Sequence, residues 1–397
     1  MRSRRGIRRA PLALTLVTAS ALAVTGCAAG APRTAQHSAA DSSATPEQTK
    51  TVDPATAYVN ARLANMTLRQ KVASLLMLHQ PGTDGAALRG FVDRYGVGGM
   101  ILMGDNVLGS PAALAAQNAA MTASDPQLPP LVAIDEEGGD VTRLPWDTLP
   151  GADVLKAQPP AATQAAFSQR AALLKQAGVT VNFGTIADTT ADPDSFIYDR
   201  VLGMTPAAAA DRVAASVTGE RGQVFSTLKH FPGHGETEAD SHTSIPTTAV
   251  SVAEWRARDA PPFGAGIAAG TELVMFGHLV YSAVDAAPAS LSAPWHRILS
   301  DTLGFHGVTI TDDMRMLQDS GLPQYANPEE NAVQALAAGN TMLLYVLPAD
   351  PAAAGLDPDA LIDAVVGAVG SGRIPAAQID ADARKLLELR HELATKE

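Results

Sequence analysis

A lysine, three histidines and an aspartate lie within fourteen positions of the chain, in the segments Lys229–Gly235 and Asp240–His242. A proline and two glycines inside the first segment disfavour a regular helix. These polar side chains are therefore expected on a shaped loop, where chemistry is often carried. Asp240 and His242 are two positions apart, which suits a carboxylate that orients an imidazole for proton transfer.

The same histidines leave a second chemistry open, because His230, His234 and His242 could bind zinc. The first two are four positions apart, as ligands on one helical turn would be, but the intervening proline and glycine break such a turn. No glutamate occupies the metalloprotease position between them, and His234 could simply shape the loop. Proton transfer is therefore favoured, and no metal is expected.

Two groups of carboxylates follow apolar runs. Asp312 and Asp313 come directly after Gly307–Thr311, so one carboxylate can face a site while the other starts the next helix. In the alternative, both only cap that helix. The triplet Asp135–Glu137 precedes two glycines and suits hydrogen bonds to sugar hydroxyls. Its alternatives are a solvated turn or a calcium site, although the spacing does not match a calcium loop.

These candidates require elements that end close together. Short apolar segments alternate with helical stretches such as Pro160–Ala177 and Asn327–Ala338, a pattern typical of a parallel sheet covered on both faces. The sequence predicts an α/β fold, a single (β/α)8 barrel, with a doubly wound open sheet as the alternative. The predicted strands are Val72–Leu78, Gly98–Met103, Leu131–Ile134, Val179–Phe183, Val224–Leu228, Leu273–Phe276, Val308–Thr311 and Thr341–Val346.

Five of these strands end in residues that could do chemistry. Barrel enzymes build their sites at the carboxyl ends of strands, so five such ends indicate a site more strongly than one. The residues are Asp135, Asn182, Lys229 with His230, His278 and Asp312.

The first 27 residues have the pattern of an export signal. Five arginines precede an apolar run from Ala10 to Val24, too short for a confident membrane span. The run ends in Val24–Cys27, which resembles a lipobox, with an ordinary secretory signal as the alternative. We expect lipidation at Cys27 and a lipid anchor on the outer face of the bacterial cell membrane. Residues 28–54 predict a disordered tether, and 55–397 the barrel.

Composition narrows the function classes. Cys27 is the only cysteine, so the mature domain has no disulfide, thiol nucleophile or thiolate metal site. The formal net charge is −12, or about −17 once the five arginines of the leader are subtracted. Such acidity argues against nucleic acid as a partner, and against a basic patch as the membrane anchor.

The two histidine segments resemble the signature of glycoside hydrolase family 3, in its β-N-acetylglucosaminidase branch. The resemblance runs from about Met66 to about Leu387. It also includes Gly98–Leu102, Pro288–Ser292 and Leu303–Phe305. We expect a monomer without a cofactor, and no second C-terminal domain, because the sequence ends soon after the eighth predicted unit. The implied reaction is a retaining removal of non-reducing terminal N-acetylglucosamine, from a glycan or muropeptide of peptidoglycan.

The resemblance also implies roles for individual residues. Asp312 would be the nucleophile that forms a covalent glycosyl-enzyme, and His242 the acid/base, oriented by Asp240. An imidazole is neutral after it gives up its proton, so phosphate as well as water could accept the sugar. The residues that would bind the hydroxyls and the N-acetyl group are Asp135, Arg200, Lys229 and His230.

The chain departs from the family pattern in ways that bear on the sugar subsite. Asp140 stands where a second basic residue is common, with Arg143 three positions further on. Thr341 replaces an acid in the eighth strand, and Tyr198 a small residue. The expected absence of a second domain, which supplies a glutamate acid/base in larger relatives, favours His242. Two rivals remain: a β-glucosidase or β-xylosidase, and a barrel that binds cell-wall sugars without cleaving them.

Overall fold

The computed structural model describes residues 53–237 and 239–395. The predicted leader, Cys27 and all but the last two residues of the predicted tether lie outside the described residues. The described part opens with α1 (Pro54–Asn65), where the Asp53 side chain accepts the backbone N–H of Thr56 as an N-cap. No helix of this described part is long and apolar enough to cross a membrane.

Eight parallel strands close into a barrel in the order β1-β10-β9-β7-β5-β4-β3-β2. The closed barrel confirms the predicted fold and excludes the open sheet. Outside the barrel, β6 (Thr247–Thr248) pairs with β8 (Val280–Tyr281). The barrel strands are β1 (Leu76–Leu78), β2 (Gly99–Leu102), β3 (Leu131–Ile134), β4 (Val181–Ile186), β5 (Phe225–Phe231), β7 (Leu273–Phe276), β9 (Val308–Asp313) and β10 (Met342–Tyr345).

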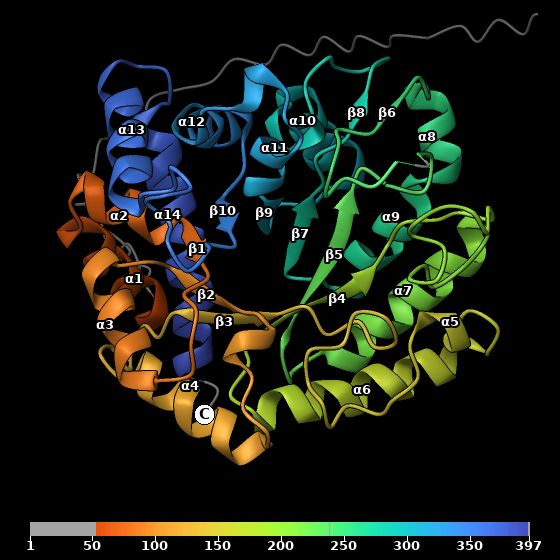
Figure 1. The fold of residues 1–397 in the computed structure, drawn as a ribbon, viewed down its shortest axis with the longest axis horizontal. Coiled ribbons are helices and arrows are strands. Elements are labelled where there is room, and N and C mark those ends of the chain that lie inside the picture. Colours follow the sequence, from red (N-terminus) through yellow and green to blue (C-terminus); the bar gives the residue numbers. More distant parts are fainter. Residues whose placement is uncertain (1–52, 238, 396–397) are drawn as a thin grey trace, which may run out of the picture. The chain divides into compact units, whose positions relative to one another are not determined.

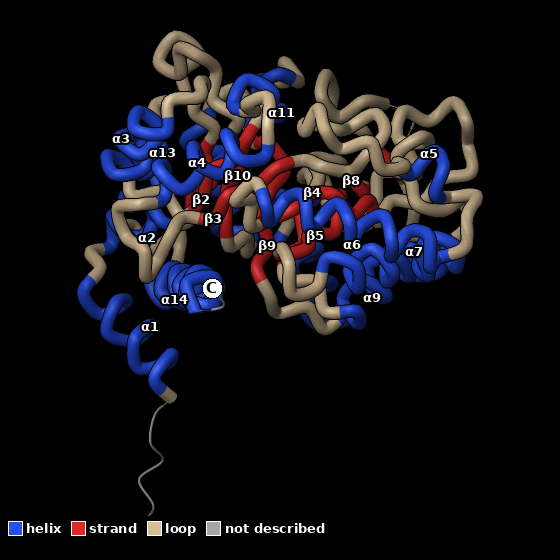
Figure 2. Tube along the Cα trace, turned by 90° about the horizontal axis from the view of Figure 1, so that it is seen from below, coloured by secondary structure: helices blue, strands red, loops and turns tan. Residues whose placement is uncertain are grey.

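Helices surround the strands, and Figure 1 shows them as an outer ring. In Figure 2 the long loops gather along the upper edge, on the side away from α1 and α14. Besides α1, the helices are α2 (Leu68–Ser74), α3 (Gly85–Tyr95), α4 (Pro111–Thr122), α5 (Ala152–Leu155), α6 (Pro160–Gln176), α7 (Pro206–Glu220), α8 (Val252–Arg258), α9 (Ala260–Ala269), α10 (Ala293–Leu303), α11 (Arg315–Asp319), α12 (Pro328–Ala338), α13 (Pro358–Gly370) and α14 (Ala376–Thr395). Short 3-10 turns cover Gly104–Asn106, Ala289–Leu291 and Pro323–Tyr325. Two of these helices, α6 and α12, confirm the stretches predicted from the sequence.

The first predicted strand, Val72–Leu78, is wrong in its first half, because the chain is helical as far as Ser74. The Thr67 hydroxyl accepts the N–H of Gln70, and the Gln70 side chain accepts the N–H of Thr67. This capping box starts α2, and the helix continues through Val72–Ser74, the first residues of the predicted strand. The remaining strand, Leu76–Leu78, still pairs with β2 and β10.

Three strands run further than predicted, and this changes where the candidate residues lie. Ile186 of β4 pairs with Lys229, Phe231 of β5 pairs with Phe276, and Asp313 of β9 pairs with Leu344. Two of these predicted strands stop just before Lys229 and Asp312, because a charged residue marks the expected strand end. Backbone pairing around the barrel instead carries β5 and β9 through these positions. Consequently Lys229, His230 and Asp312 lie on the strands themselves.

Candidate active site

Four charged side chains form one network at the carboxyl ends of β3 and β5 and on the loop after β4. Lys229 Nζ lies 2.6 Å from Asp135 Oδ1 and 2.9 Å from Glu137 Oε1. The Arg200 guanidinium donates to both carboxylate oxygens of Glu137, at 2.9 and 2.8 Å. The structure thus brings together Asp135, Arg200 and Lys229, three of the predicted sugar-binding residues.

Glu137 is the centre of this network, although the sequence analysis placed it only in an acidic triplet that suits sugar hydroxyls and did not single it out. Burial opposes its ionisation, but Lys229 and Arg200 outweigh that effect and lower the pKa of Glu137 to about 2. A sequence signal was present: Asp135 and Glu137 are two positions apart after a strand, and alternate residues of an extended chain share a face. Gly138 follows at a φ of 84°, where an added Cβ would collide with the buried Arg170 guanidinium.

His230 is held by Asp188, a second residue that the sequence analysis missed. His230 Nδ1 lies 2.8 Å from Asp188 Oδ2, and the backbone N–H of His230 donates to both Asp188 oxygens at 3.2 Å. The backbone N–H of His234 also donates to Asp188, at 2.7 Å. The predicted fourth strand ended at Phe183, so Asp188 looked like a loop residue, whereas β4 extends to Ile186.

The adjacent aspartates of β9 have different surroundings. Asp312 Oδ1 accepts the N–H of Asp313 at 2.8 Å, and Asp312 Oδ2 lies 4.0 Å from His230 Nε2. Burial opposes ionisation of Asp312, but the charges of His230, His278 and Lys229 lower its pKa. A carboxylate that is ionised at neutral pH can act as a nucleophile.

Asp313 is instead tied to the backbone. Its Oδ1 accepts the N–H of Arg315 at 3.1 Å and that of Val346 at 3.0 Å. Burial, together with the nearby charge of Asp312, raises the pKa of Asp313 to about 7. The predicted division therefore holds, with one carboxylate at the site and its neighbour at the start of α11.

Two other residues that the sequence analysis placed at strand ends, His278 and Asn182, form hydrogen bonds to adjacent protein groups. His278 Nδ1 lies 2.7 Å from Ser290 Oγ, and its Nε2 lies 3.0 Å from the Asp313 carbonyl oxygen. Asn182 lies within β4 and donates to the backbone carbonyl of Glu136 and to the buried Glu220 carboxyl. His278 thus borders Asp312 through the backbone, while Asn182 braces the barrel interior.

Large aromatic side chains fix the start of the histidine loop. Trp255 Nε1 donates to the carbonyl of Pro232 at 2.8 Å, and the Tyr281 hydroxyl donates to that of Gly233 at 2.7 Å. Phe231 packs edge-on against Trp255 and Phe276, with ring centroids 6.0 and 4.9 Å apart. The segment that leaves β5 is therefore held by side chains of α8, β7 and β8.

The predicted pair of Asp240 and His242 forms further along this loop. Asp240 Oδ1 accepts the backbone N–H of His242 at 2.9 Å and lies 2.7 Å from its Nδ1. The side chains are 45% and 63% exposed, respectively. Within the described residues, no hydrogen bond or ion pair joins His242 to Asp312. The structure assembles the predicted pair but does not bring it into contact with the predicted nucleophile.

The zinc alternative finds no support in the histidine positions. His234 is buried, its Nδ1 lies 3.1 Å from the Thr237 hydroxyl, and burial lowers its pKa to about 4. His230 uses Nδ1 for Asp188, and His242 points to solvent. Over residues 53–237 and 239–395, no group of three or more His, Cys, Asp or Glu side chains is arranged to hold a metal ion.

The departures from the family pattern lie at different distances from the network. Thr341 precedes β10, at the opposite end of that strand from the site, and its hydroxyl donates to Asp382 at 3.4 Å. Asp140 is exposed. Tyr198 lies against Lys156, whose Nζ is 4.0 Å from the centroid of the tyrosine ring. Arg143 does reach the network, with Nη2 3.9 Å from Asp135 Oδ2. Arg143 thus brings a positive charge to this network, which Asp140 does not.

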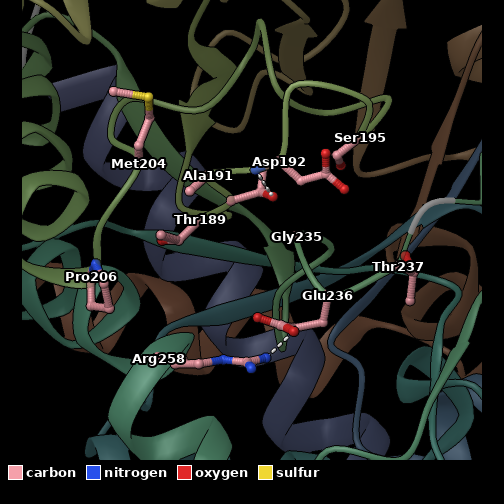
Figure 3. A pocket seen from close by; sticks show the side chains of 11 residues that line it. Thr189, Ala191, Asp192, Ser195, Met204, Pro206, Gly235, Glu236, Thr237 and Arg258 are labelled. Atoms are coloured by element: carbon pink, nitrogen blue, oxygen red, sulfur yellow. Dashed lines mark hydrogen bonds and ion pairs between the residues drawn. The ribbon is translucent and has the colours of Figure 1, made fainter.

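A polar pocket of about 390 Å³ lies beside the histidine loop (Figure 3). Its walls include Thr189, which follows Asp188 in the chain, and the loop segment Gly235–Thr237. Arg258 pairs with Glu236 at one side of the pocket, as the dashed line in Figure 3 marks. None of the predicted catalytic residues lines this pocket.

Comparisons with known proteins agree with this geometry. Residues 67–389 match the glycosyl hydrolase family 3 N terminal domain. A beta-hexosaminidase from Nitrosospira multiformis is 36% identical over 233 residues, covering 54% of this chain and 64% of that protein. A glycoside hydrolase family 3 beta-N-acetylglucosaminidase from Paenibacillus sp. superposes with a TM-score of 0.76 and 31% identity, over 83% of this chain and 63% of that chain.

A beta-N-acetylhexosaminidase from Beutenbergia cavernae superposes with a TM-score of 0.72 and 29% identity. The match covers 82% of this chain and 99% of that one. The chain therefore spans less than two thirds of the Nitrosospira and Paenibacillus proteins, and nearly the whole of the Beutenbergia protein.

Proposed function

This chain belongs to glycosyl hydrolase family 3, and on that premise we propose that it is an exo-acting β-N-acetylglucosaminidase. The observation that carries the proposal is Asp312, an ionised carboxylate 4.0 Å from His230 Nε2 and under the charge of Lys229. The similarity to a β-N-acetylglucosaminidase and to beta-hexosaminidases supports the choice of sugar.

The reaction would proceed with retention in two steps. Asp312 attacks the anomeric carbon while the imidazolium of His242 gives its Nε2 proton to the departing glycosidic oxygen. Neutral His242 then takes a proton from water, and the resulting hydroxide displaces Asp312 from the sugar. Asp240 supports this role because it engages Nδ1, and no hydrogen bond to Nε2 is present within the described residues.

The charged network would bind the terminal sugar. Asp135 offers carboxylate oxygens to neighbouring hydroxyls, while Lys229 and Arg200 offer donors to hydroxyl and carbonyl oxygens. The network supports a small polar group with both donors and acceptors rather than an apolar ligand. His230 would complete the subsite from the side nearest Asp312.

We extend the proposal to peptidoglycan fragments as the substrate and to the outer face of the cell membrane as the location. The support is the sequence pattern of residues 1–27, which would place the barrel beside the cell wall. Mass spectrometry of the protein extracted from membranes tests the anchor. A diacylglycerol-modified Cys27 at the new N-terminus is expected, and an unmodified cysteine would contradict it.

Nitrophenol release from the β-N-acetylglucosaminide, with wild type beside Asp312→Asn, tests the activity. The variant should lose turnover by about 10⁴-fold or more, because it lacks the nucleophile. Faster release from the β-glucoside or β-xyloside would instead identify the rival glycosidases. Sugar binding without release from any glycoside would identify a binding protein. Mass spectrometry of a trapped glycosyl-enzyme tests retention, with the label expected on Asp312.

A further inference from the structure

Asp188 is fully buried on the loop that follows β4, beside the neighbouring strand β5. It receives hydrogen bonds from two backbone N–H groups, those of His230 and His234, and from the imidazole Nδ1 of His230. These donors flank the segment Phe231–Gly233, in which the proline has no N–H to give. Asp188 is thus the one carboxylate that contacts both the backbone and the ring of His230 within the described residues.

We propose that Asp188 is a positioning residue that keeps the proton of His230 on Nδ1, so that Nε2 faces Asp312 and the bound sugar. The position of the proton on Nδ1 follows from the structure alone. The contact of Nε2 with a sugar rests on the proposed function.

The direction of the hydrogen bond follows from the charge of Asp188. Burial opposes its ionisation, but the charges and hydrogen bonds of His230 and His234 lower the pKa of Asp188. An ionised carboxylate only accepts hydrogen bonds, so Nδ1 of His230 must carry the hydrogen. The distance of 2.8 Å between Nδ1 and Oδ2 is normal for such a bond.

The packing around His230 also opposes a flip of the ring. On the side of β7, a Cβ added at Gly277 would lie 3.1 Å from the His230 Cβ, so this residue is held closely against the backbone. A flipped imidazole would place a carbon against the Asp188 carboxylate and remove the ring from its hydrogen-bond donors, leaving only the backbone N–H groups of His230 and His234. Losing such a bond costs more than an exposed one, because the carboxylate cannot turn to water.

The consequence lies at Nε2. Its distance of 4.0 Å from Asp312 Oδ2 is too long for a direct hydrogen bond, which leaves both atoms available to a substrate. In neutral His230, Nε2 can accept a hydrogen bond from a sugar hydroxyl. In the imidazolium, Nε2–H can donate one to a sugar oxygen. The charged and titratable groups that act on the ring are Asp188 from the loop after β4, Asp312 from β9, His278 after β7 and His234 on the histidine loop.

The first test measures the tautomer in the wild-type domain by long-range ¹H–¹⁵N NMR, with the His230 signals assigned by their loss in His230→Gln. We expect the neutral ring to carry its proton on Nδ1. A neutral ring protonated on Nε2 would overturn the proposal. This measurement needs neither substrate nor turnover, so it separates failure of the proposal from failure of the proposed function.

The second test replaces Asp188 with asparagine, whose amide can present an N–H to Nδ1 and so move the ring proton to Nε2. A loss of kcat/KM on the order of 10²-fold is expected, with an altered pH profile, because a wrong histidine tautomer impairs catalysis without removing the residue. Asp259→Asn is the matched control. Asp259 is also buried beside this loop, against Gly233, yet neither carboxylate oxygen has a hydrogen-bond partner. The Asp259→Asn variant should leave the His230 tautomer unchanged.

A double-mutant cycle then separates positioning from simple support of the loop. If Asp188 acts through the imidazole, Asp188→Asn should cost less than about threefold in a His230→Ala background. An equal loss in both backgrounds would show that Asp188 acts only through the backbone, and would overturn the proposal. If Asp188→Asn does not fold, the wild-type tautomer still decides.

Discussion

Glu137 and Arg200 form a two-point ion pair, with two nitrogen–oxygen distances of 2.8 and 2.9 Å and side chains only 4% and 15% exposed. The same carboxylate lies 2.9 Å from Lys229, so one buried anion compensates two cations. The positions of both predicted sugar-binding cations thus depend on a carboxylate that the sequence analysis named only as part of an acidic triplet.

Glu137→Gln should destabilise the domain by about 3 kcal/mol, because it removes the ion-pair partner of the buried Arg200 and leaves Lys229 with Asp135 alone. Urea unfolding of the variant beside wild type measures the difference. Glu330→Gln is the control, since Glu330 also pairs with an arginine, Arg373, but at the surface. The urea midpoint of Glu330→Gln should be nearly the same as that of wild type, because an exposed ion pair contributes little stability. A comparable loss in both variants would contradict the argument from burial.

The acid stability of the fold should depend on the same carboxyl. The pKa of Glu137 is about 2 in the folded protein against 4.5 ordinarily, so its contribution is present above about pH 4.5. It is lost as the pH falls towards 2, and amounts to about 3 kcal/mol. Unfolding measured between pH 6 and 2 should show a shallower decline in Glu137→Gln than in wild type. Parallel curves would refute this linkage.

Asp313→Asn should behave unlike Asp312→Asn despite the adjacent position. The folded pKa of Asp313 is about 7 against 3.8, so ionising it costs stability as the pH rises through that window. The asparagine variant should lack that decline, and it should keep turnover within about tenfold of wild type, because the neutral side chain retains its backbone contacts. Thermal unfolding between pH 4 and 8, with nitrophenol release, measures both. Loss of turnover equal to that of Asp312→Asn would reassign the nucleophile.

His242→Ala should slow substrates with poor leaving groups by 10²- to 10⁴-fold, because their oxygen needs a proton as it departs. Nitrophenol leaves as an anion, so its release in the first step should change much less. A series of aryl glycosides with graded leaving-group pKa measures the dependence. A loss that does not vary across the series would remove His242 from the acid role.

Phosphate offers a further check on the histidine. If neutral His242 leaves the second step open to an anion, incubation with substrate and inorganic phosphate should yield N-acetylglucosamine 1-phosphate. Phosphorus NMR of the reaction mixture detects that product directly. Its absence at a phosphate concentration that leaves hydrolysis unaffected would show that water is the acceptor.

Short-range patterns predicted most of the fold. Alternating apolar runs and helical stretches identified the barrel. The errors came where long-range pairing decides the outcome. Lys229 and Asp312 looked like residues beyond strand ends, yet neighbouring strands extend the ladder through them.

The candidate site divides in the same manner. Asp240 and His242 were predictable because they contact each other within three residues. The contacts of Asp188 and of Glu137 were not predictable, since each side chain binds residues at least 42 positions away. Only closure of the barrel brings such groups together.

The local character of Asp240 and His242 has a consequence for engineering. Their mutual hydrogen bonds lie within the loop, whereas Asp312 belongs to the barrel wall. Under the proposed roles, the proton donor and the nucleophile therefore belong to separate parts of the fold. Exchanging the loop for one with another acid would then leave the strand that carries Asp312 in place, so that leaving-group preference and sugar preference could be evolved as separate traits.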